Sequence, residues 1–344
     1  MEAQAQAIPG DDVEQLRQAS QGCQQLRQEI SKVIIGQEQT VRALLTAILA
    51  QGHVLLIGVP GLAKTLLVKT LAAALGWKFH RIQFTPDMMP ADIIGMELLQ
   101  DDPATGRRSM RFVPGPIFAN LILADEINRT PPKTQAALLE AMQEYTVTSM
   151  GRSYPLEKPF IVVATQNPIE QEGTYPLPEA QLDRFMFSLW MDYPSQEEEE
   201  RIVLETTSPR DAQPSPRFTK EQMLSFQSLV QRVPASPHVV RYAVALARAT
   251  RPRHPDASDF VRQYVEWGAG PRAAQHMVLA GKALAVIDGE PAVTLDHIRQ
   301  AAPLVLRHRV LPNYQAVGEG IDAAAIVDRL LSDLDPAHLA PAAN

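Results

Sequence analysis

Apolar residues recur at three- and four-residue intervals near the beginning of the sequence, which is the pattern of an amphipathic helix. This pattern covers residues 11–34, and a second helical pattern follows at residues 41–50. A helix with one apolar stripe packs either on the core of its own protein or on a partner. We interpret the first helix as one that packs on the protein's own core.

Five short apolar runs are typical of buried strands. They lie at residues 53–57, 79–84, 121–124, 160–165 and 185–190. Helical patterns lie between them, for example at residues 66–75 and 133–145. Buried strands that alternate with helices indicate a parallel sheet with helices on both faces. The sequence therefore predicts an α/β region that extends to about residue 190.

The pattern changes after residue 190, where the segment WMDYP at residues 190–194 is typical of a linker. Helices and turns are predicted from there on. Two capping boxes indicate helix starts, Ser195 with Glu198 and Thr219 with Gln222. We interpret the glutamates at residues 197–200 as the first turn of a helix, where carboxylates complement the helix dipole, rather than as an acidic interaction patch. Residues 208–216 are rich in proline and predict a loop.

The length of 344 residues is sufficient for two domains. Hydrophobic residues make up 45% of the chain and charged residues 21%, which is ordinary for a globular protein with a sizeable core. The changes along the chain predict an N-terminal helix (1–34), an α/β core (35–192), an α-helical domain (193–334) and a loosely ordered tail (335–344).

Charge and cysteine content exclude several classes of protein. The 32 Lys and Arg against 39 Asp and Glu give a net charge of −7, which excludes nucleic-acid binding through bulk positive charge but not through a local basic groove. The single cysteine, Cys23, excludes an internal disulfide and a multi-cysteine zinc site and favours a reducing compartment. No apolar run approaches the roughly 18 residues that span a membrane, and the first residues lack the pattern of a signal peptide. We expect a cytoplasmic protein without membrane insertion.

The connection between the first strand and its helix has the composition of a phosphate-binding loop. The loop spans residues 58–65, and the expected nucleotide contacts are Gly58, Pro60, Gly61, Leu62, Ala63, Lys64, Thr65 and Leu66. Backbone amides at a helix N-terminus bind phosphate, and we expect Lys64 to contact the β- and γ-phosphates and Thr65 to bind Mg²⁺. Ala63 stands where glycine normally precedes the lysine, and we expect it to be tolerated only with a negative φ. The alternative is an ordinary strand–helix turn that contains glycine.

Two adjacent acids, Asp125 and Glu126, end the strand predicted at residues 121–124. A buried apolar strand has no structural use for paired carboxylates at its end, whereas a magnesium–nucleotide site does. We expect Asp125 to hold Mg²⁺ through its water shell and Glu126 to polarise the attacking water as general base. The alternative is an acidic first turn of the following helix. Asn167 ends the next strand and could orient the water, although Asn-Pro after a strand is by itself typical of a turn.

Several stretches resemble the AAA+ ATPases, and within them the MoxR group of the helix-2-insert branch. They are GVPGLAKT at 58–65, DEINRTPPKTQ at 125–135, ATQNP at 164–168 and LPEAQLDRF at 177–185. The phosphate loop with alanine before the lysine is itself similar to the group's version. The resemblance extends from about Val33 to Arg309, and it implies an AAA+ P-loop core with a parallel five-stranded sheet, followed by an all-α helical lid domain.

The resemblance also implies roles for individual residues. Asn167 resembles sensor 1. Arg184 matches the arginine finger that completes the site of a neighbouring subunit, and its alternative is an ion pair with Asp183 or a nearby acid. Arg272, in the stretch GPRA, resembles sensor 2 and would reach from the lid to the γ-phosphate; its alternative is a solvated arginine at a helix start.

The resemblance implies roles for four further features. Ile35, Gly36 and Gln37 resemble the segment that packs against adenine, with a plain helix-cap glycine as the alternative. Arg129 is a candidate second arginine that acts on a neighbour. Two inserts, residues 87–115 and a hairpin at 147–155, would point toward the pore of a ring, with simple exposed loops as the alternative.

The resulting hypothesis is a Mg²⁺-dependent ATPase that forms a homo-oligomeric ring, expected to be a hexamer, and remodels protein clients. The family also implies partners with von Willebrand factor A domains. A nucleic-acid motor of the same branch is the alternative, which the net charge of −7 disfavours. A nucleotide-switched scaffold without hydrolysis is a third interpretation. Strong stimulation of ATP turnover by DNA distinguishes the motor, and measurable turnover excludes the scaffold.

Overall fold

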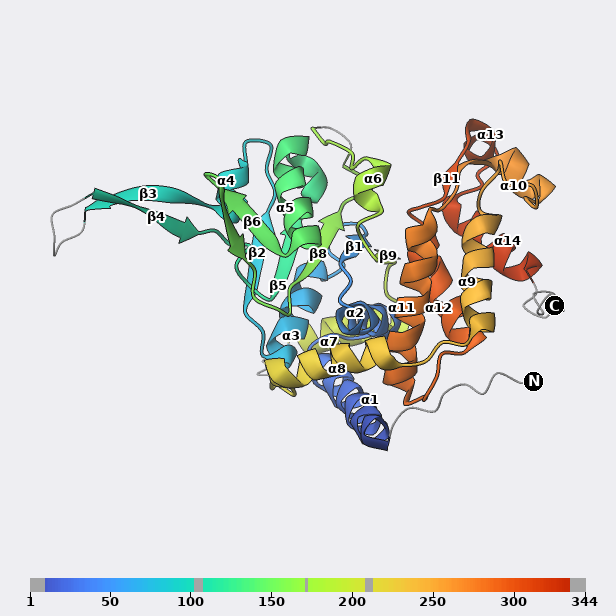
Figure 1. Cartoon of the computed structure of the whole chain (residues 1–344), viewed down its shortest axis with the longest axis horizontal. Helices are drawn as coiled ribbons and strands as arrows, with labels where there is room; N and C mark the ends of the chain where they lie inside the picture. Colours follow the sequence, from blue (N-terminus) through green and yellow to red (C-terminus); the bar gives the residue numbers. More distant parts are fainter. Residues whose placement is uncertain (1–9, 102–107, 171–172, 208–212, 335–344) are drawn as a thin grey trace.

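The computed structural model describes residues 10–101, 108–170, 173–207 and 213–334. The predicted tail and the first part of the predicted loop at 208–216 lie outside these residues. Five parallel strands form the central sheet in the order β2-β5-β8-β1-β9, as expected from the alternation of strands and helices (Figure 1). The strands are β1 (Val54–Ile57), β2 (Phe79–Gln83), β5 (Leu121–Asp125), β8 (Ile161–Gln166) and β9 (Phe187–Trp190).

Side chains on these strands alternate between two apolar clusters, because successive residues of a strand point to opposite faces. On β1, Val54 and Leu56 join the cluster under the N-terminal helices, while Leu55 joins the cluster on the other face. The strands β5 and β8 alternate in the same way. Both faces of the sheet are therefore buried, which explains why the strands are continuous apolar runs.

Helices cover both faces of the sheet. The helices of this region are α1 (Gly10–Ser31), α2 (Glu38–Leu49), α3 (Lys64–Leu75), α5 (Pro132–Glu144), α6 (Glu179–Leu182) and the 3₁₀ turn η1 (Ile127–Arg129). The apolar stripe of α1, for example Leu26 and Ile30, is buried with α2 and α3 in the first cluster, while α5 buries Leu138 and Leu139 in the second. The interpretation of the first helix as packed on its own core is confirmed.

The two inserts form hairpins. The first contains α4 (Pro90–Ile94), β3 (Gly95–Asp101) and β4 (Arg108–Pro114), and the second contains β6 (Thr146–Ser149) and β7 (Arg152–Pro155). Figure 1 shows the β3–β4 hairpin projecting to the left, away from the rest of the molecule. Phe112 on β4 stacks on Tyr154 on β7 with ring centroids 3.8 Å apart, so the two inserts contact each other. The predicted hairpin at 147–155 is confirmed.

The region after β9 is mainly helical. Its elements are α7 (Gln196–Thr206), α8 (Lys220–Arg232), α9 (Pro237–Ala249), α10 (Asp259–Tyr264), β10 (Val265–Trp267), α11 (Pro271–Asp288), α12 (Leu295–Leu306), β11 (Leu311–Pro312), α13 (Tyr314–Gly318) and α14 (Ala323–Asp333). Both predicted capping boxes are present, at Ser195 and Thr219. The short antiparallel pair of β10 and β11 was not expected. Side chains of α9, α11 and α12 continue the apolar cluster that covers one face of the sheet.

His53, just before β1, is a buried neutral side chain. Its Nε2 donates to the carbonyl of Met142 and its Nδ1 accepts from the amide of Val162, each over 3.0 Å. Burial lowers the pKa of His53 to about 4. The ring is therefore uncharged in the folded protein at neutral pH and joins the strand β8 to the helix α5.

The buried His53 makes the folded protein sensitive to acid. Below the unfolded-state pKa of about 6.5 the unfolded chain takes up a proton that the folded chain refuses until about pH 4, so stability falls with pH in this window. We expect His53 alone to lower the free energy of unfolding by about 2 kcal/mol between pH 7 and pH 5. Urea unfolding of the wild type and of His53→Gln at both pH values measures this contribution. An equal loss in the two proteins would show that His53 does not carry it.

Candidate functional site

The phosphate-binding loop connects the end of β1 to the start of α3, as the sequence predicted. Gly61 has φ +89°, a conformation that glycine adopts without strain. Ala63 has φ +56° and ψ 24°, so the expectation of a negative φ is wrong. The left-handed conformation costs an alanine about 1 kcal/mol. It allows the chain to turn directly into α3, whose first amides remain available to an anion.

Lys64 begins α3 and points back over the loop. Its Nζ donates to the carbonyl oxygen of Gly58, the first residue of the loop. Burial lowers the pKa of Lys64, and the carboxylates of Asp125 and Glu126 oppose this effect. The loop therefore places one ammonium group next to the first amides of α3, which is the environment that a polyphosphate requires.

Asp125 ends β5 beside the phosphate loop and is buried. Its Oδ1 accepts a hydrogen bond of 2.5 Å from the Thr165 hydroxyl, and its Oδ2 lies 3.5 Å from the Thr65 hydroxyl oxygen. A carboxylate and a hydroxyl oxygen at this separation fit a single Mg²⁺, which takes oxygen ligands at about 2.1 Å. The side chains of Thr65 and Asp125 are thus suited to the metal role that the sequence predicted for them.

Glu126 follows Asp125 in the left-handed conformation, with φ +57°. Its amide donates to the Thr165 hydroxyl over 2.9 Å, and this bond fixes the turn. Its Oε2 accepts from Arg129 Nη1 over 3.0 Å and from Gln83 Nε2 over 2.8 Å. The carboxylate is therefore held in one place by two donors from different elements, and its role as general base stays a prediction.

Two residues of this site, Arg81 and Gln83, escaped the sequence analysis. Both lie on β2, which pairs with β5 so that Gln83 is opposite Asp125. Arg81 donates to Asp125 Oδ2 from Nε over 3.0 Å and from Nη2 over 2.7 Å. The polar residues of β2 look like the solvent-exposed half of an edge strand in the sequence. Only the position of β2 next to β5 reveals that they contact the two acids.

Asn167 lies after β8, and β8 pairs with β5, so the amide and the acids are neighbours as expected. Asn167 is buried, and its Oδ1 accepts from the amide of Ile169 over 3.1 Å, which is the turn that Asn-Pro suggests. Because the turn uses the carbonyl oxygen, the Nδ2 group is the donor that a water or a phosphate could use. The turn and the sensor role are compatible.

The segment 35–37 lies beside the phosphate loop. Gln37 Nε2 donates to the carbonyl of Leu62 over 3.2 Å, and Ile35 is buried. Gly36 has φ +68°, and a Cβ there would lie 2.1 Å from a carboxylate oxygen of Glu198 at the start of α7. The positive φ is the reason that glycine is favoured here, because the Glu198 side chain can move away from a Cβ. Contact with adenine stays a prediction for Ile35, Gly36 and Gln37.

A second cluster of charged residues surrounds Asp183, directly before Arg184. Asp183 Oδ2 accepts from Arg272 Nη1 over 2.8 Å and Oδ1 accepts from Arg309 Nε over 2.7 Å. The alternative in which Arg184 pairs with Asp183 is not realised. Within the described part of the chain, the guanidinium of Arg184 makes no hydrogen bond or ion pair.

This second cluster lies at the amino ends of the parallel strands, whereas the phosphate loop lies at their carboxyl ends. Val54 and Ile57 on β1 are opposite Phe187 and Trp190 on β9, so the two strands run side by side in the same direction. The phosphate loop follows Ile57, whereas Arg184 precedes Phe187. At about 3.3 Å per residue the two ends of this strand pair are on the order of 10 Å apart. Arg184 therefore lies at the opposite end of this strand pair from the phosphate loop of its own chain.

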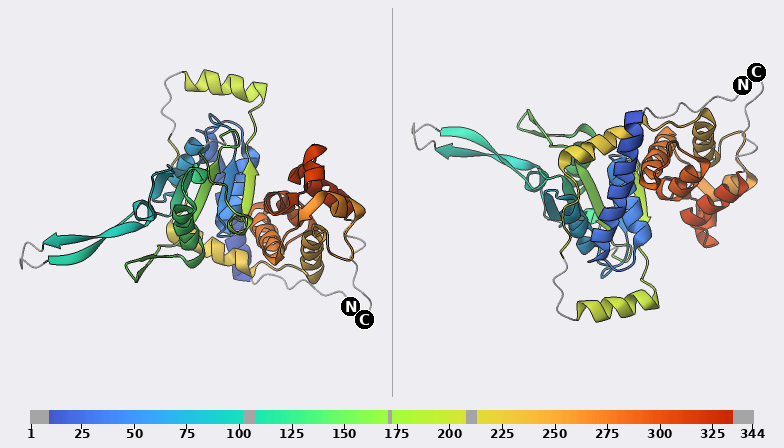
Figure 2. Two further views of the ribbon diagram at one scale, coloured as in Figure 1. Left: turned by 90° about the horizontal axis from the view of Figure 1, so that it is seen from above. Right: turned by 90° about the horizontal axis from the view of Figure 1, so that it is seen from below.

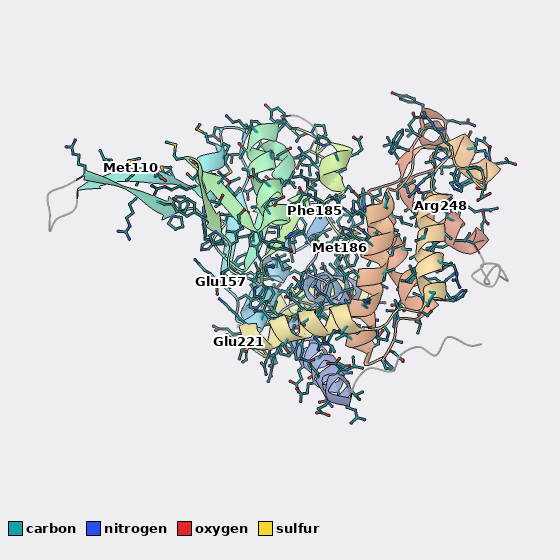
Figure 3. All side chains as sticks on the ribbon, in the orientation of Figure 1. Met110, Glu157, Phe185, Met186, Glu221 and Arg248 are labelled. Carbon is teal, nitrogen blue, oxygen red and sulfur yellow. The ribbon has the colours of Figure 1, made fainter. Side chains whose placement is uncertain are left out.

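Arg272 lies at the same end of the strands as Arg184, because it binds Asp183. The resemblance led us to expect that its guanidinium reaches the γ-phosphate, but in the structure it binds Asp183 at the far edge of the sheet. The first residues of α11 bring it there, because α11 packs beside the segment that leads into β9. Figure 3 shows Phe185 and Met186 of this segment between the sheet and α11. Both arginines therefore lie at the opposite ends of the strands from the phosphate loop of their own chain.

Arg309 is the buried centre of the second cluster. It donates to the carbonyl of Phe185 over 2.7 Å and to His276 Nδ1 over 2.9 Å. Burial, and then the charge of Arg309, lower the pKa of His276 to about 3, so the ring stays a neutral acceptor. Arg309 therefore ties the segment before β9 to α11 and α12. The sequence analysis missed it because nothing near Arg309 in the chain marks it as buried.

Removing the Asp183 carboxylate leaves the Arg309 guanidinium buried without its counterion, since that side chain is only 2% exposed. We expect Asp183→Asn to lower the free energy of unfolding by about 3 kcal/mol. Asp333→Asn breaks the exposed pair with Arg329 and should cost less than about 1 kcal/mol. Denaturant unfolding of the two variants tests this difference. Similar small losses in both would contradict a stabilising role of Asp183.

Comparisons with known proteins agree with this architecture. Residues 53–187 match the model of the ATPase family associated with various cellular activities (AAA), and residues 258–330 match the AAA lid domain. The crystal structure of a candidate ATPase from Cytophaga hutchinsonii has a TM-score of 0.86 and 39% identity, and the match covers 94% of this chain and 97% of the other. The fold and the phosphate loop thus define a protein of the AAA class.

Two relatives narrow this class. Chaperone MoxR1 of Mycobacterium tuberculosis is 42% identical over 305 residues, which are 88% of this chain and 79% of that protein. Protein MoxR of Methylorubrum extorquens is 32% identical over 300 residues, which are 82% of this chain and 85% of that protein. The chain belongs to the MoxR family of AAA ATPases. Among the described helices, none is long and apolar enough to cross a membrane.

Proposed function

We propose that this chain hydrolyses ATP to ADP and phosphate at a Mg²⁺-dependent site that two subunits of a ring share. The observation that carries the proposal is the separation of its charged groups. Lys64, Asp125 and Glu126 lie at one edge of the sheet, and Arg184 with Arg272 lies at the other. In one chain the arginines beside the phosphate loop, Arg81 and Arg129, are bound to Asp125 and Glu126, and Arg184 and Arg272 lie at the other ends of the strands. A head-to-tail contact between copies brings the two halves together, and such contacts form a ring when the rotation from copy to copy closes. We take the ring to be a hexamer.

Each residue has a separate role in the proposed reaction. The loop amides and Lys64 hold the phosphates, and Thr65 and Asp125 hold the metal. Bound Mg²⁺ supplies positive charge to the phosphate oxygens as negative charge develops on them. Glu126 accepts the proton of the attacking water, and Asn167 orients this water. Arg184 and Arg272 of the neighbouring subunit stabilise the charge that leaves with the γ-phosphate.

We propose that ATP hydrolysis by this chain drives the remodelling of other proteins. The relative from Mycobacterium tuberculosis is named a chaperone, and 42% identity over most of this chain supports a similar role here. A von Willebrand factor A domain protein as partner and a cytoplasmic location stay predictions. The net charge of −7 and the named relatives give no support to the nucleic-acid motor.

The proposed function requires both the metal and Lys64. Purified protein should release phosphate from ATP with MgCl₂ and lose this activity in EDTA. Lys64→Ala should lower turnover by at least about 10²-fold, because a preorganised charge on the phosphates is removed. Lys69→Ala, on the same helix but past its first turn, is the matched control and should retain activity. Binding of ATP without any release of phosphate would instead favour the nucleotide-switched scaffold.

A further inference from the structure

The helix α7 extends outward from the molecule, with Glu198 in its first turn against Gly36. None of its 11 residues is buried, and Figure 2 shows it beyond the ends of the strands. Its outward face combines two glutamates, Glu199 and Glu200, with Val203 and Leu204 one turn later, and these apolar side chains are 59% and 70% exposed. A helix this short is only marginally stable without packing. A surface that covers its exposed apolar side chains would stabilise it.

A cleft of about 760 Å³ lies at the other edge of the sheet, between α6 and the lid. Three exposed apolar side chains line it, Trp267, Leu311 and Val317. Arg307 also lines the cleft, and its Nε is buried with no hydrogen-bond partner among the described residues. The cleft thus offers apolar area and an arginine donor that lacks an acceptor.

The acids of the cleft do not compensate this arginine. Asp183 is held by Arg272 and Arg309, and Asp322 accepts from the amide of Ala325 over 2.8 Å as the cap of α14. Glu179 is the remaining acid of the cleft lining. An apolar pair that is preceded by glutamates matches this combination of apolar wall and unsatisfied arginine.

We propose that α7 of one subunit docks into this cleft of the next subunit, with Val203 and Leu204 against its apolar wall and Glu199 or Glu200 toward Arg307. The two surfaces lie at opposite edges of one sheet, because α7 follows the end of β9 and the cleft includes Asp183 before its start. The contact is therefore head-to-tail, which repeats from copy to copy. In this contact the glutamates still complement the dipole at the start of α7, and they also contact the neighbouring subunit.

This contact rests on the proposed function, and it describes how two subunits would be arranged around one ATP site. Glu198 at the start of α7 lies against Gly36, and the neighbouring Gln37 contacts the phosphate loop. Asp183 in the cleft is adjacent to Arg184. An 11-residue helix is about 16 Å long. Docking of α7 therefore brings the Arg184 edge of one subunit next to the nucleotide edge of its neighbour.

Cysteine crosslinking tests the contact directly. In Leu204→Cys/Val317→Cys, mild oxidation in the presence of Mg²⁺ and ATP should produce covalent species of two, three and more chains. The native Cys23 does not interfere, because it is buried and burial raises its pKa to about 12. Leu204→Cys/Leu224→Cys, with the second cysteine on α8, is the matched control and should give at least tenfold less crosslinked product. A crosslink confined to dimers, or equal yields in both proteins, would overturn the proposal.

A charge exchange provides an independent check. Glu199→Arg/Glu200→Arg should weaken subunit association at least tenfold in sedimentation experiments, and Arg307→Glu added to it should recover most of the loss. No weakening, or no recovery, counts against docking at this cleft. If crosslinks form but ATP is not hydrolysed, the contact stands and the proposed function is wrong. If ATP is hydrolysed with arginines acting between subunits but the crosslinks are absent, the proposed function stands and the α7 contact is wrong.

Discussion

Replacing Arg184 with alanine is expected to lower ATP turnover by about 10³- to 10⁵-fold, the range in which arginines that complete a phosphoryl-transfer site act. The guanidinium makes no ion pair or hydrogen bond within the described chain, so its removal breaks no contact that stabilises the fold. Arg184 also lies at the opposite end of the strands from the phosphate loop of its own chain. We therefore expect the affinity for ATP to change only a few-fold while kcat falls.

Steady-state phosphate release and equilibrium binding of a fluorescent ATP analogue separate these two effects. Arg329→Ala, which removes an exposed arginine on α14, is the control and should leave both values unchanged. A kcat near that of the wild type in Arg184→Ala would remove this residue from the reaction. A large loss of ATP affinity with unchanged kcat would instead indicate that Arg184 contributes to binding in the ground state.

Glu126→Gln is expected to lower kcat by about 10²- to 10⁴-fold and to leave ATP binding intact. The substitution keeps the shape of the side chain and an oxygen that can accept from Gln83 and Arg129, but it removes the base that takes the proton of water. Loss of turnover should therefore occur without loss of the surrounding hydrogen bonds. The variant should accumulate bound ATP.

Single-turnover kinetics with bound ATP measure this step without product release. Glu140→Gln, an exposed carboxylate on α5, is the matched control and should behave as the wild type. Normal single-turnover rates in Glu126→Gln would show that another group activates the water. Because the variant holds ATP, it is also suited to capture protein clients, whose identity distinguishes a chaperone role from other roles.

Local sequence predicted one half of the candidate site well. The phosphate loop and the acids after β5 depend on residues that are adjacent in the chain, and the apolar runs that flank them are long enough to identify the strands. The conformation of Ala63 could not be predicted in this way. Its positive φ is imposed by the turn into α3, against the preference of the residue itself.

The other half depends on contacts between distant residues. Arg81 and Gln83 reach the acids only because β2 is the neighbour of β5. Arg272 and Arg309 meet at Asp183 although they are 89 and 126 residues away from it in the chain. Spacing and periodicity carry no information on such pairings. For the same reason the position of Arg272 at the far edge of the sheet had to come from the structure.

The central claim is that one ATP site uses residues of two subunits, and mixed rings test it most directly. Lys64→Ala and Arg184→Ala are each expected to be inactive alone. After mixing in equal amounts and reassembly, about one interface in four should join an intact phosphate loop to an intact arginine, whatever the size of the ring. We expect ATP turnover to recover to about a quarter of the wild-type rate. If the mixture stays as inactive as its components, the ATP site belongs to a single chain.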